Sequence, residues 1–138
     1  MAQRLVRTIC PFCKEETLVE AHRLSALGIR SSRESERLWR GKGCSRCRNT
    51  GYMGRIGVYE VLSMESRTLE LVHQDSSEES IRNEALNRGM TPLAYDAAQK
   101  VLKGITTLEE ALMVAGIGVY PPLNEVSPRL CISRGELG

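Results

Sequence analysis

The chain has 138 residues, of which 41% are hydrophobic and 26% charged, a composition typical of one ordinary soluble domain with room for an appendage. Its first residues form no apolar leader, and no run of about 18 apolar residues occurs, so we expect a cytoplasmic chain without export signal or membrane span. The formal net charge of +2 is unevenly divided, because residues 1–57 are basic and residues 58–138 acidic.

The first half contains two cysteine pairs joined by short segments of mixed character. Residues 3–9 form a lead-in that the pattern assigns to neither helix nor strand. Thr17 is followed three residues later by Glu20, a capping box that predicts a helix ending at Gly28. Residues 31–37 are polar and predict a loop. Trp39, the only tryptophan, is expected to pack beside the cysteine pairs.

The segment after the second cysteine pair predicts a β-strand. Residues 52–62 are rich in β-branched and aromatic side chains, and several of these alternate in the manner of a half-buried strand. Gly54 and Gly57 within it indicate a bend or a close approach of another backbone.

From residue 63 the apolar period changes from two to that of a helix. One helix is predicted from Glu65 to Gln74, with Leu69 and Val72 facing inward. Capping signals open three more helices, at Ser76 with Glu79, at Thr91 before Pro92, and at Thr107 with Glu110. The side chains expected on their buried faces are Ile81, Ala85, Leu86, Leu93, Ala97, Val101, Leu108, Ala111, Leu112 and Ala115.

These elements predict a helix-rich α+β fold, in which a tetracysteine knuckle element with short strands precedes a small helical bundle. The expected divisions are residues 1–63 for the cysteine element, 64–116 for the helical subdomain and 117–138 for a flexible tail. Cys131, in the tail, is expected to be an unpaired thiol.

The two Cys-x-x-Cys pairs, Cys10 with Cys13 and Cys44 with Cys47, are the strongest chemical signal in the sequence. Two such turns facing each other supply the four sulfurs that a tetrahedral zinc site uses. The prediction is one structural zinc per chain, because four cysteines leave no coordination position for water, with disulfides or free thiols as alternatives. His22 is interpreted as a surface residue, and no catalytic residue is predicted.

The charge around the cysteines leaves other functions open. Bases near the cysteines could lower the thiol pKa values, or could form a surface for an acidic partner or nucleic acid. A small nucleic-acid-binding zinc-ribbon protein is therefore an alternative, although the chain has only six aromatic residues, which are not clustered in the basic half and so do not favour base stacking. A Cys-x-x-Cys redox protein is a second alternative, but it needs a βαβ scaffold that the pattern does not offer.

Three segments together resemble one protein family. In chain order they are AQRLVRTICPFCKE, LWRGKGCSRCRNTGYMGRIGVYEVL and SSEESIRNEALNRGMTPLAYDAAQKVLKGITTLEEAL. They resemble the C-terminal portion of the type II secretion and type IV pilus assembly ATPases over residues 2–115, in order as well as in content.

The resemblance implies that the four cysteines bind zinc in the cytoplasmic motor of a secretion or pilus system. In that family the motor is a hexamer docked on inner-membrane platform proteins, so other motor subunits and those proteins are the implied partners. Gly54, Arg55, Gly57 and Glu60 fall on a shared run, to which only a role in shaping the strand is assigned. The sequence contains no phosphate-binding loop, so this chain alone is expected not to hydrolyse ATP.

Overall fold

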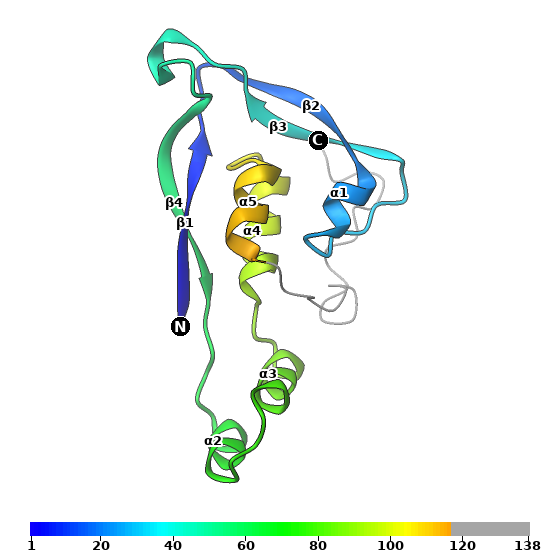
Figure 1. The fold of residues 1–138 in the computed structure, drawn as a ribbon, viewed down its shortest axis with the longest axis vertical. Helices are drawn as coiled ribbons and strands as arrows, with labels where there is room; N and C mark the ends of the chain where they lie inside the picture. Colours follow the sequence, from blue (N-terminus) through cyan, green and yellow to red (C-terminus); the bar gives the residue numbers. More distant parts are fainter. Residues whose placement is uncertain (117–138) are drawn as a thin grey trace.

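The computed structural model describes residues 1–116, in which two antiparallel strand pairs surround two central helices (Figure 1). The predicted α+β class is confirmed, with five α-helices among these residues. The elements are β1 (Ala2–Ile9), β2 (Lys14–Glu20), α1 (Ala21–Ser25), β3 (Ser35–Gly41), the 3-10 turn η1 (Ser45–Cys47), β4 (Tyr52–Glu60), α2 (Ser66–His73), α3 (Glu78–Asn87), α4 (Leu93–Leu102) and α5 (Leu108–Ala115).

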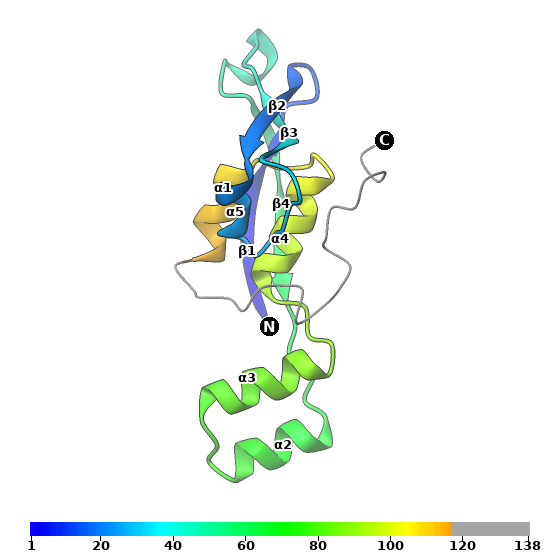
Figure 2. The ribbon, with the colours of Figure 1, turned by 90° about the vertical axis from the view of Figure 1, so that its right-hand side faces the viewer.

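The strands form two separate antiparallel ladders. β1 pairs with β4, so that Val6 lies opposite Ile56, and β2 pairs with β3, so that Thr17 lies opposite Leu38. The β1–β2 and β3–β4 connections meet at one end of the molecule (Figure 2). The predicted strand over residues 52–62 is confirmed as β4, and the unassigned lead-in is β1.

The helix predicted from Thr17 is wrong. Residues 14–20 are strand β2, and the short helix α1 begins only at Ala21. Residues 14–20 instead form backbone hydrogen bonds with residues 35–41, and this pairing overrides the helix signal of the capping box. The sequence pattern had placed part of residues 35–41 in a loop. The side chains follow a period of two there, since Val19 is buried while Leu18 is 70% exposed.

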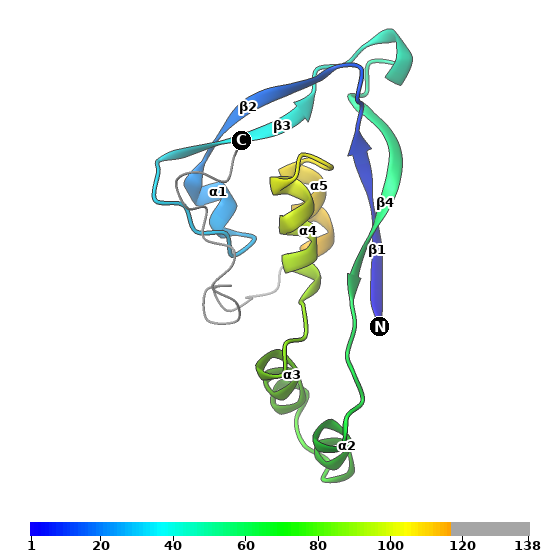
Figure 3. The ribbon, with the colours of Figure 1, turned by 180° about the vertical axis from the view of Figure 1, so that it is seen from behind.

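The core lies where α4 and α5 pack between the β1–β4 ladder and the β2–β3 ladder with α1 (Figure 3). Its fully buried side chains come from both halves of the chain and include Val6, Leu24, Leu38, Val58, Ala97, Val101, Leu108 and Ala111. The inward faces predicted for α4 and α5 are confirmed, apart from Leu112, which packs only partly buried against the core. The expected division at residue 63 stays a prediction.

Helices α2 and α3 lie at the end of the molecule opposite the cysteine turns (Figure 1). Both helices were predicted, but the inward placement of Leu69 and Val72 is wrong, because these side chains are 40% and 46% exposed. Thr68 is the buried residue of α2, and Ala85 and Leu86 are buried on α3 as expected. Packing of α2 against α3 therefore leaves apolar side chains of α2, Leu69 and Val72, on the surface.

The helix starts are close to their predicted positions. Ser77 caps α3 by accepting a hydrogen bond from the Ser80 N–H at 3.2 Å, one residue after the expected cap. Pro92 is itself the N-cap of α4, in place of Thr91. Thr107 caps α5 as predicted, accepting from the Glu110 N–H at 3.3 Å.

Among residues 1–116, no helix is long and apolar enough to cross a membrane. The expected tail and Cys131 lie outside the described residues.

Candidate metal centre

The four predicted cysteines come together where the β1–β2 and β3–β4 connections meet. All four Sγ atoms lie within 4.8 Å of one another. Three of these separations are 3.7 Å between Cys44 and Cys47, 3.8 Å between Cys13 and Cys47, and 3.9 Å between Cys10 and Cys44. Cys10 and Cys47 are buried, whereas Cys13 and Cys44 are partly exposed.

These separations fit a metal better than a disulfide. Zinc about 2.3 Å from four sulfurs at the corners of a tetrahedron places neighbouring sulfurs about 3.8 Å apart. A disulfide would bring two sulfurs to about 2.05 Å. The cluster therefore has the donor set and the spacing of a closed tetrathiolate site.

Backbone amides point at the sulfurs. The Gly43 N–H donates to the Cys13 sulfur at 3.3 Å, and the N–H groups of Cys44 and Gly51 donate to the Cys47 sulfur at 3.3 and 3.2 Å. The backbone is left-handed at Asn49 and Gly51, with φ of 60° and 78°, in the turn that brings the Gly51 N–H to the Cys47 sulfur, and asparagine and glycine both tolerate such angles. Donors of this kind stabilise thiolates over thiols.

The thiols of Cys13 and Cys47 differ in pKa because of their surroundings. Burial acts to raise the pKa of Cys47, but the N–H groups of Cys44 and Gly51 and the neighbouring thiols lower this pKa to about 6. Burial raises the pKa of Cys13 to about 12, with the neighbouring thiols adding to this effect and the Gly43 N–H opposing it. Of these two thiols Cys47 is therefore the more acidic, and a divalent cation at the centre would favour the thiolate form of its ligands.

Two glycines let the cysteine turns approach each other. A Cβ atom on Gly41 would lie 1.9 Å from the Gly51 carbonyl oxygen, and one on Gly51 would lie 2.5 Å from the Gly41 carbonyl oxygen. The Cys10 N–H donates to the same Gly51 carbonyl at 2.9 Å. The first cysteine turn, the end of β3 and the start of β4 are thus in direct backbone contact, which no larger residue at Gly41 would permit.

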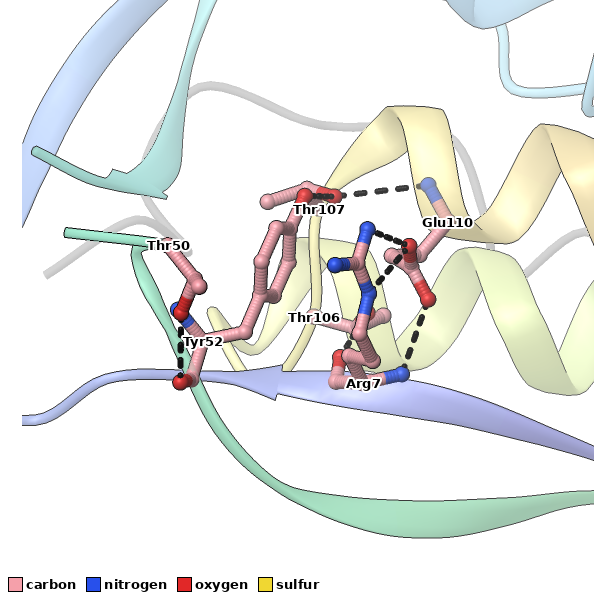
Figure 4. A network of polar contacts seen from close by, with 6 residues as sticks. All are labelled: Arg7, Thr50, Tyr52, Thr106, Thr107 and Glu110. Carbon is pink, nitrogen blue, oxygen red and sulfur yellow. Dashed lines mark hydrogen bonds and ion pairs between the residues drawn. The ribbon is translucent and has the colours of Figure 1, made fainter. Parts of the chain in front are cut away.

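The cysteine end of the molecule is tied to the helices by a polar network (Figure 4). Arg7 on β1 donates to the Glu110 carboxylate through its backbone N–H at 2.9 Å and through its guanidinium at 2.7 and 2.9 Å. The guanidinium also lies 4.0 Å from the centroid of the Tyr52 ring, whose hydroxyl is 2.9 Å from that of Thr107. Thr50 extends the network, since its hydroxyl donates to the Cys47 carbonyl at 2.7 Å.

Glu110 was predicted to complete the capping box, but its carboxylate pairs with Arg7 instead. Burial acts to raise the pKa of Glu110, whereas the hydrogen bonds and the positive charge of Arg7 lower it, and the net effect is a pKa below the usual value. The side chain of Glu110 is only 8% exposed while that of Arg7 is 49% exposed, so this pair is shielded on one side only.

The Glu110→Gln variant should lose stability in a pH-dependent way. A lowered pKa in the folded state contributes stability that is present above the unfolded-state value and is lost as the pH falls through the folded-state value. At pH 7 we expect the free energy of unfolding of the variant to be about 2 kcal/mol lower than that of the parent. This difference should shrink below about pH 4.5.

Urea unfolding of the parent and the Gln variant across this pH range measures the difference. Acid also protonates the cysteines, but it does so in both proteins. The difference between their free energies of unfolding therefore reports the contribution of Glu110 alone. A gap that stays constant down to pH 3 would show that the carboxylate charge is not the source of the stabilisation.

Glu60 has a role that the sequence pattern did not assign. Its carboxylate accepts the Leu93 N–H at 3.0 Å and so caps α4 from the end of β4. Asp96 in the first turn of α4 accepts in turn from the Tyr59 N–H at 2.9 Å. The two carboxylates fasten α4 to β4. No sequence signal pointed to this role, because Glu60 is 33 residues from Leu93 and α2 and α3 lie between them.

The other singled-out residues lie near the centre without joining it. His22 is exposed, with its ring 3.2 Å from the Glu20 carboxylate, as its surface interpretation predicted. Trp39 packs against Gly104 at the α4–α5 turn, and the Lys14 ammonium lies 4.8 Å from the Trp39 ring centroid. It therefore joins β3 to the helices next to the first cysteine turn.

Comparison of the sequence with known proteins places the chain in a family. A family model described as type II/IV secretion system protein matches residues 1–113. The chain is 37% identical over 115 residues to the type IV pilus assembly ATPase TfpB of Acinetobacter baylyi, covering 83% of this chain and 20% of that protein. It is 38% identical over 114 residues to type II secretion system protein E of Pseudomonas aeruginosa, covering 83% and 22%.

A third relative is the type IV pilus assembly ATPase PilB of Thermus thermophilus, 38% identical over 113 residues, with 81% of this chain and 13% of that protein covered. The chain thus spans about a fifth or less of the length of these curated relatives. The family match covers well over half of the chain, and the resemblance noted in its three segments is confirmed. The chain belongs to the family of type II/IV secretion system proteins.

Proposed function

We propose that this chain is the zinc-binding structural module from the C-terminal part of a type II secretion or type IV pilus assembly ATPase. Cys10, Cys13, Cys44 and Cys47 would hold one zinc as thiolates, with backbone amides as their hydrogen-bond donors. The observation that carries the proposal is the sulfur spacing of 3.7–3.9 Å, which matches a zinc tetrathiolate. The zinc would fasten two chain segments together and would take no part in a reaction.

The purified chain should contain one zinc, which metal analysis measures directly. Replacement by cobalt should give the strong visible absorption of a tetrahedral thiolate complex, and Cys44→Ser should weaken or abolish it. Folded protein that contains no metal and takes up no cobalt would refute the proposal.

The role in the whole motor follows from the family. We propose that the intact protein works in the cytoplasm as a hexamer docked on inner-membrane assembly proteins, and that it supports protein secretion or pilus assembly. The relatives named as pilus assembly ATPases and secretion proteins support this assignment.

This chain alone is proposed to lack ATPase activity, because it has no phosphate-binding loop. Mg-ATP should leave its melting temperature unchanged. A ligand at about 100 times its dissociation constant would stabilise the protein by about 2.7 kcal/mol, a shift that thermal denaturation readily detects. A saturable shift would reveal a nucleotide site.

A further inference from the structure

The outer surface of the two cysteine turns has an unusual composition. We define the basic tip as the exposed residues Phe12, Lys14, Lys42, Arg46 and Arg48. The turns that carry them form one end of the molecule, away from the core and from α2 and α3 (Figure 2). The tip is therefore free to approach another molecule without displacing any described part of the chain.

The charges of the basic tip are not neutralised by the described residues. Along the neighbouring β2–β3 ladder, Arg40 pairs with Glu15 at 2.8 Å and Arg37 with Glu16 at 3.8 Å. Within residues 1–116, none of the four cations of the tip forms an ion pair, and residues 1–14 and 37–59 contain no acidic residue at all.

The cysteines do not account for these cations. Bases beside a tetrathiolate could exist to donate hydrogen bonds to its sulfurs, but the donors here are the backbone N–H groups of Gly43, Cys44 and Gly51. In the part of the chain that the structure describes, no lysine or arginine side chain donates to a cysteine sulfur. The cations of the tip are exposed and lack an ion-pair partner among residues 1–116, so they are available to an acidic partner.

One aromatic ring stands among these charges. Phe12 is 58% exposed, and the Arg46 guanidinium lies 4.3 Å from its ring centroid. Phe12 belongs to the first cysteine turn and Arg46 to the second, so this cation–π contact bridges the outside of the site. It keeps an apolar ring displayed on the surface instead of folded into the core.

We propose that the basic tip is a docking surface for an acidic segment of another protein subunit, with an apolar side chain of that segment packed on Phe12. Guanidinium forks such as those of Arg46 and Arg48 suit carboxylates in two-pronged hydrogen bonds. A protein partner is favoured over nucleic acid because the single ring, with one face occupied by Arg46, offers no row of stacking platforms. It is favoured over a membrane because the relatives are named for assemblies of proteins; to this extent the proposal rests on the proposed function.

The test measures binding of the zinc-loaded chain to a labelled peptide of aspartate and glutamate residues with one central leucine. The comparison peptide carries asparagine and glutamine in place of the acids. Two further arms use vesicles containing anionic phosphatidylglycerol and a single-stranded DNA oligonucleotide. We expect saturable binding of the acidic peptide that weakens as salt rises, and weaker binding in every other arm.

Variants localise the binding. Lys42→Glu with Arg46→Glu should weaken peptide binding about tenfold or more, because two attractive charges become repulsive. The matched control is Arg30→Glu with Arg33→Glu, an equal charge change at exposed residues between α1 and β3, and it should keep most of the affinity. Phe12→Ala should weaken binding of the acidic peptide, but not of a second acidic peptide that has asparagine in place of the leucine.

The outcomes separate this proposal from the proposed function. Zinc content and melting temperature are measured for each variant, so a variant that loses metal is replaced by Lys42→Gln with Arg48→Gln. A chain that holds one zinc but binds the acidic peptide no better than the asparagine–glutamine peptide, or no better than the Lys42→Glu with Arg46→Glu variant does, overturns the docking surface and leaves the zinc module standing. Tighter binding to vesicles or DNA than to the peptide also overturns it.

Discussion

Removing zinc from the chain with a chelator should unfold the cysteine end and most of the helical core with it. Structural zinc contributes an apparent binding free energy of about 10–16 kcal/mol in small zinc modules. A whole domain is stable by only about 5–15 kcal/mol, so the metal-free chain has little left to hold it together. The helices follow because β1, which leads into Cys10, also supplies Val6 to the core around α4 and α5.

Circular dichroism during titration with chelator measures this loss, and added zinc should reverse it. Cys44→Ser should behave as the chelated parent, whereas Cys131→Ser, which leaves the four clustered cysteines intact, should melt as the parent does. A parent chain that keeps its helical signal and melting temperature in excess chelator would show that the fold is independent of the metal.

The Gly41→Ala variant should lose zinc affinity together with stability. Its new methyl group would lie 1.9 Å from the Gly51 carbonyl oxygen, far inside contact distance, and both groups are attached directly to the backbone that carries the cysteines. Neither can move away without displacing the Gly51 N–H from the Cys47 sulfur. We expect a loss of about 3 kcal/mol or more, at the upper end of overpacking effects.

Gly89→Ala is the matched control, because nothing lies within 4 Å of a Cβ atom there, although φ is +93°. It should cost about 1–2 kcal/mol through backbone strain alone and leave zinc binding unchanged. Chemical unfolding and a competition assay with a zinc-binding dye give the two quantities. Equal effects of the two substitutions on zinc affinity would contradict the role given to the close contact between Gly41 and Gly51.

The cysteine cluster and the central helices could be predicted because their signals are local. Each Cys-x-x-Cys pair forms a turn by itself. The threonine that caps α5 lies three residues from the N–H group from which it accepts a hydrogen bond. The same locality misled the interpretation of Thr17, where the capping box and the helical spacing were real features of the sequence. Pairing with residues 35–41 decided that segment, and no pattern within residues 14–20 records it.

The contacts that hold the site in place could not be predicted either, because they too join residues far apart in the sequence. Glu110 carries two possible roles, a reciprocal cap for its own helix or a partner for a distant arginine, and only the packing of α5 against β1 selects the second. Gly41 likewise looks like an ordinary turn residue until Gly51 is placed against it. Long-range proximity distinguishes these cases, and a single sequence does not encode it in spacing.

The attachment of Arg7 to Glu110 also affects the order in which the chain can fold during synthesis. The two residues are 103 positions apart, and β1 must further wait for β4 before its backbone is paired. A growing chain therefore carries β1 as an unpaired strand until β4 has left the ribosome, and it carries Arg7 without its carboxylate partner until α5 has begun to emerge. Lone strands of this kind readily pair with other chains, and the arginines at positions 4 and 7 place positive charge along this one, which disfavours such pairing while the strand waits.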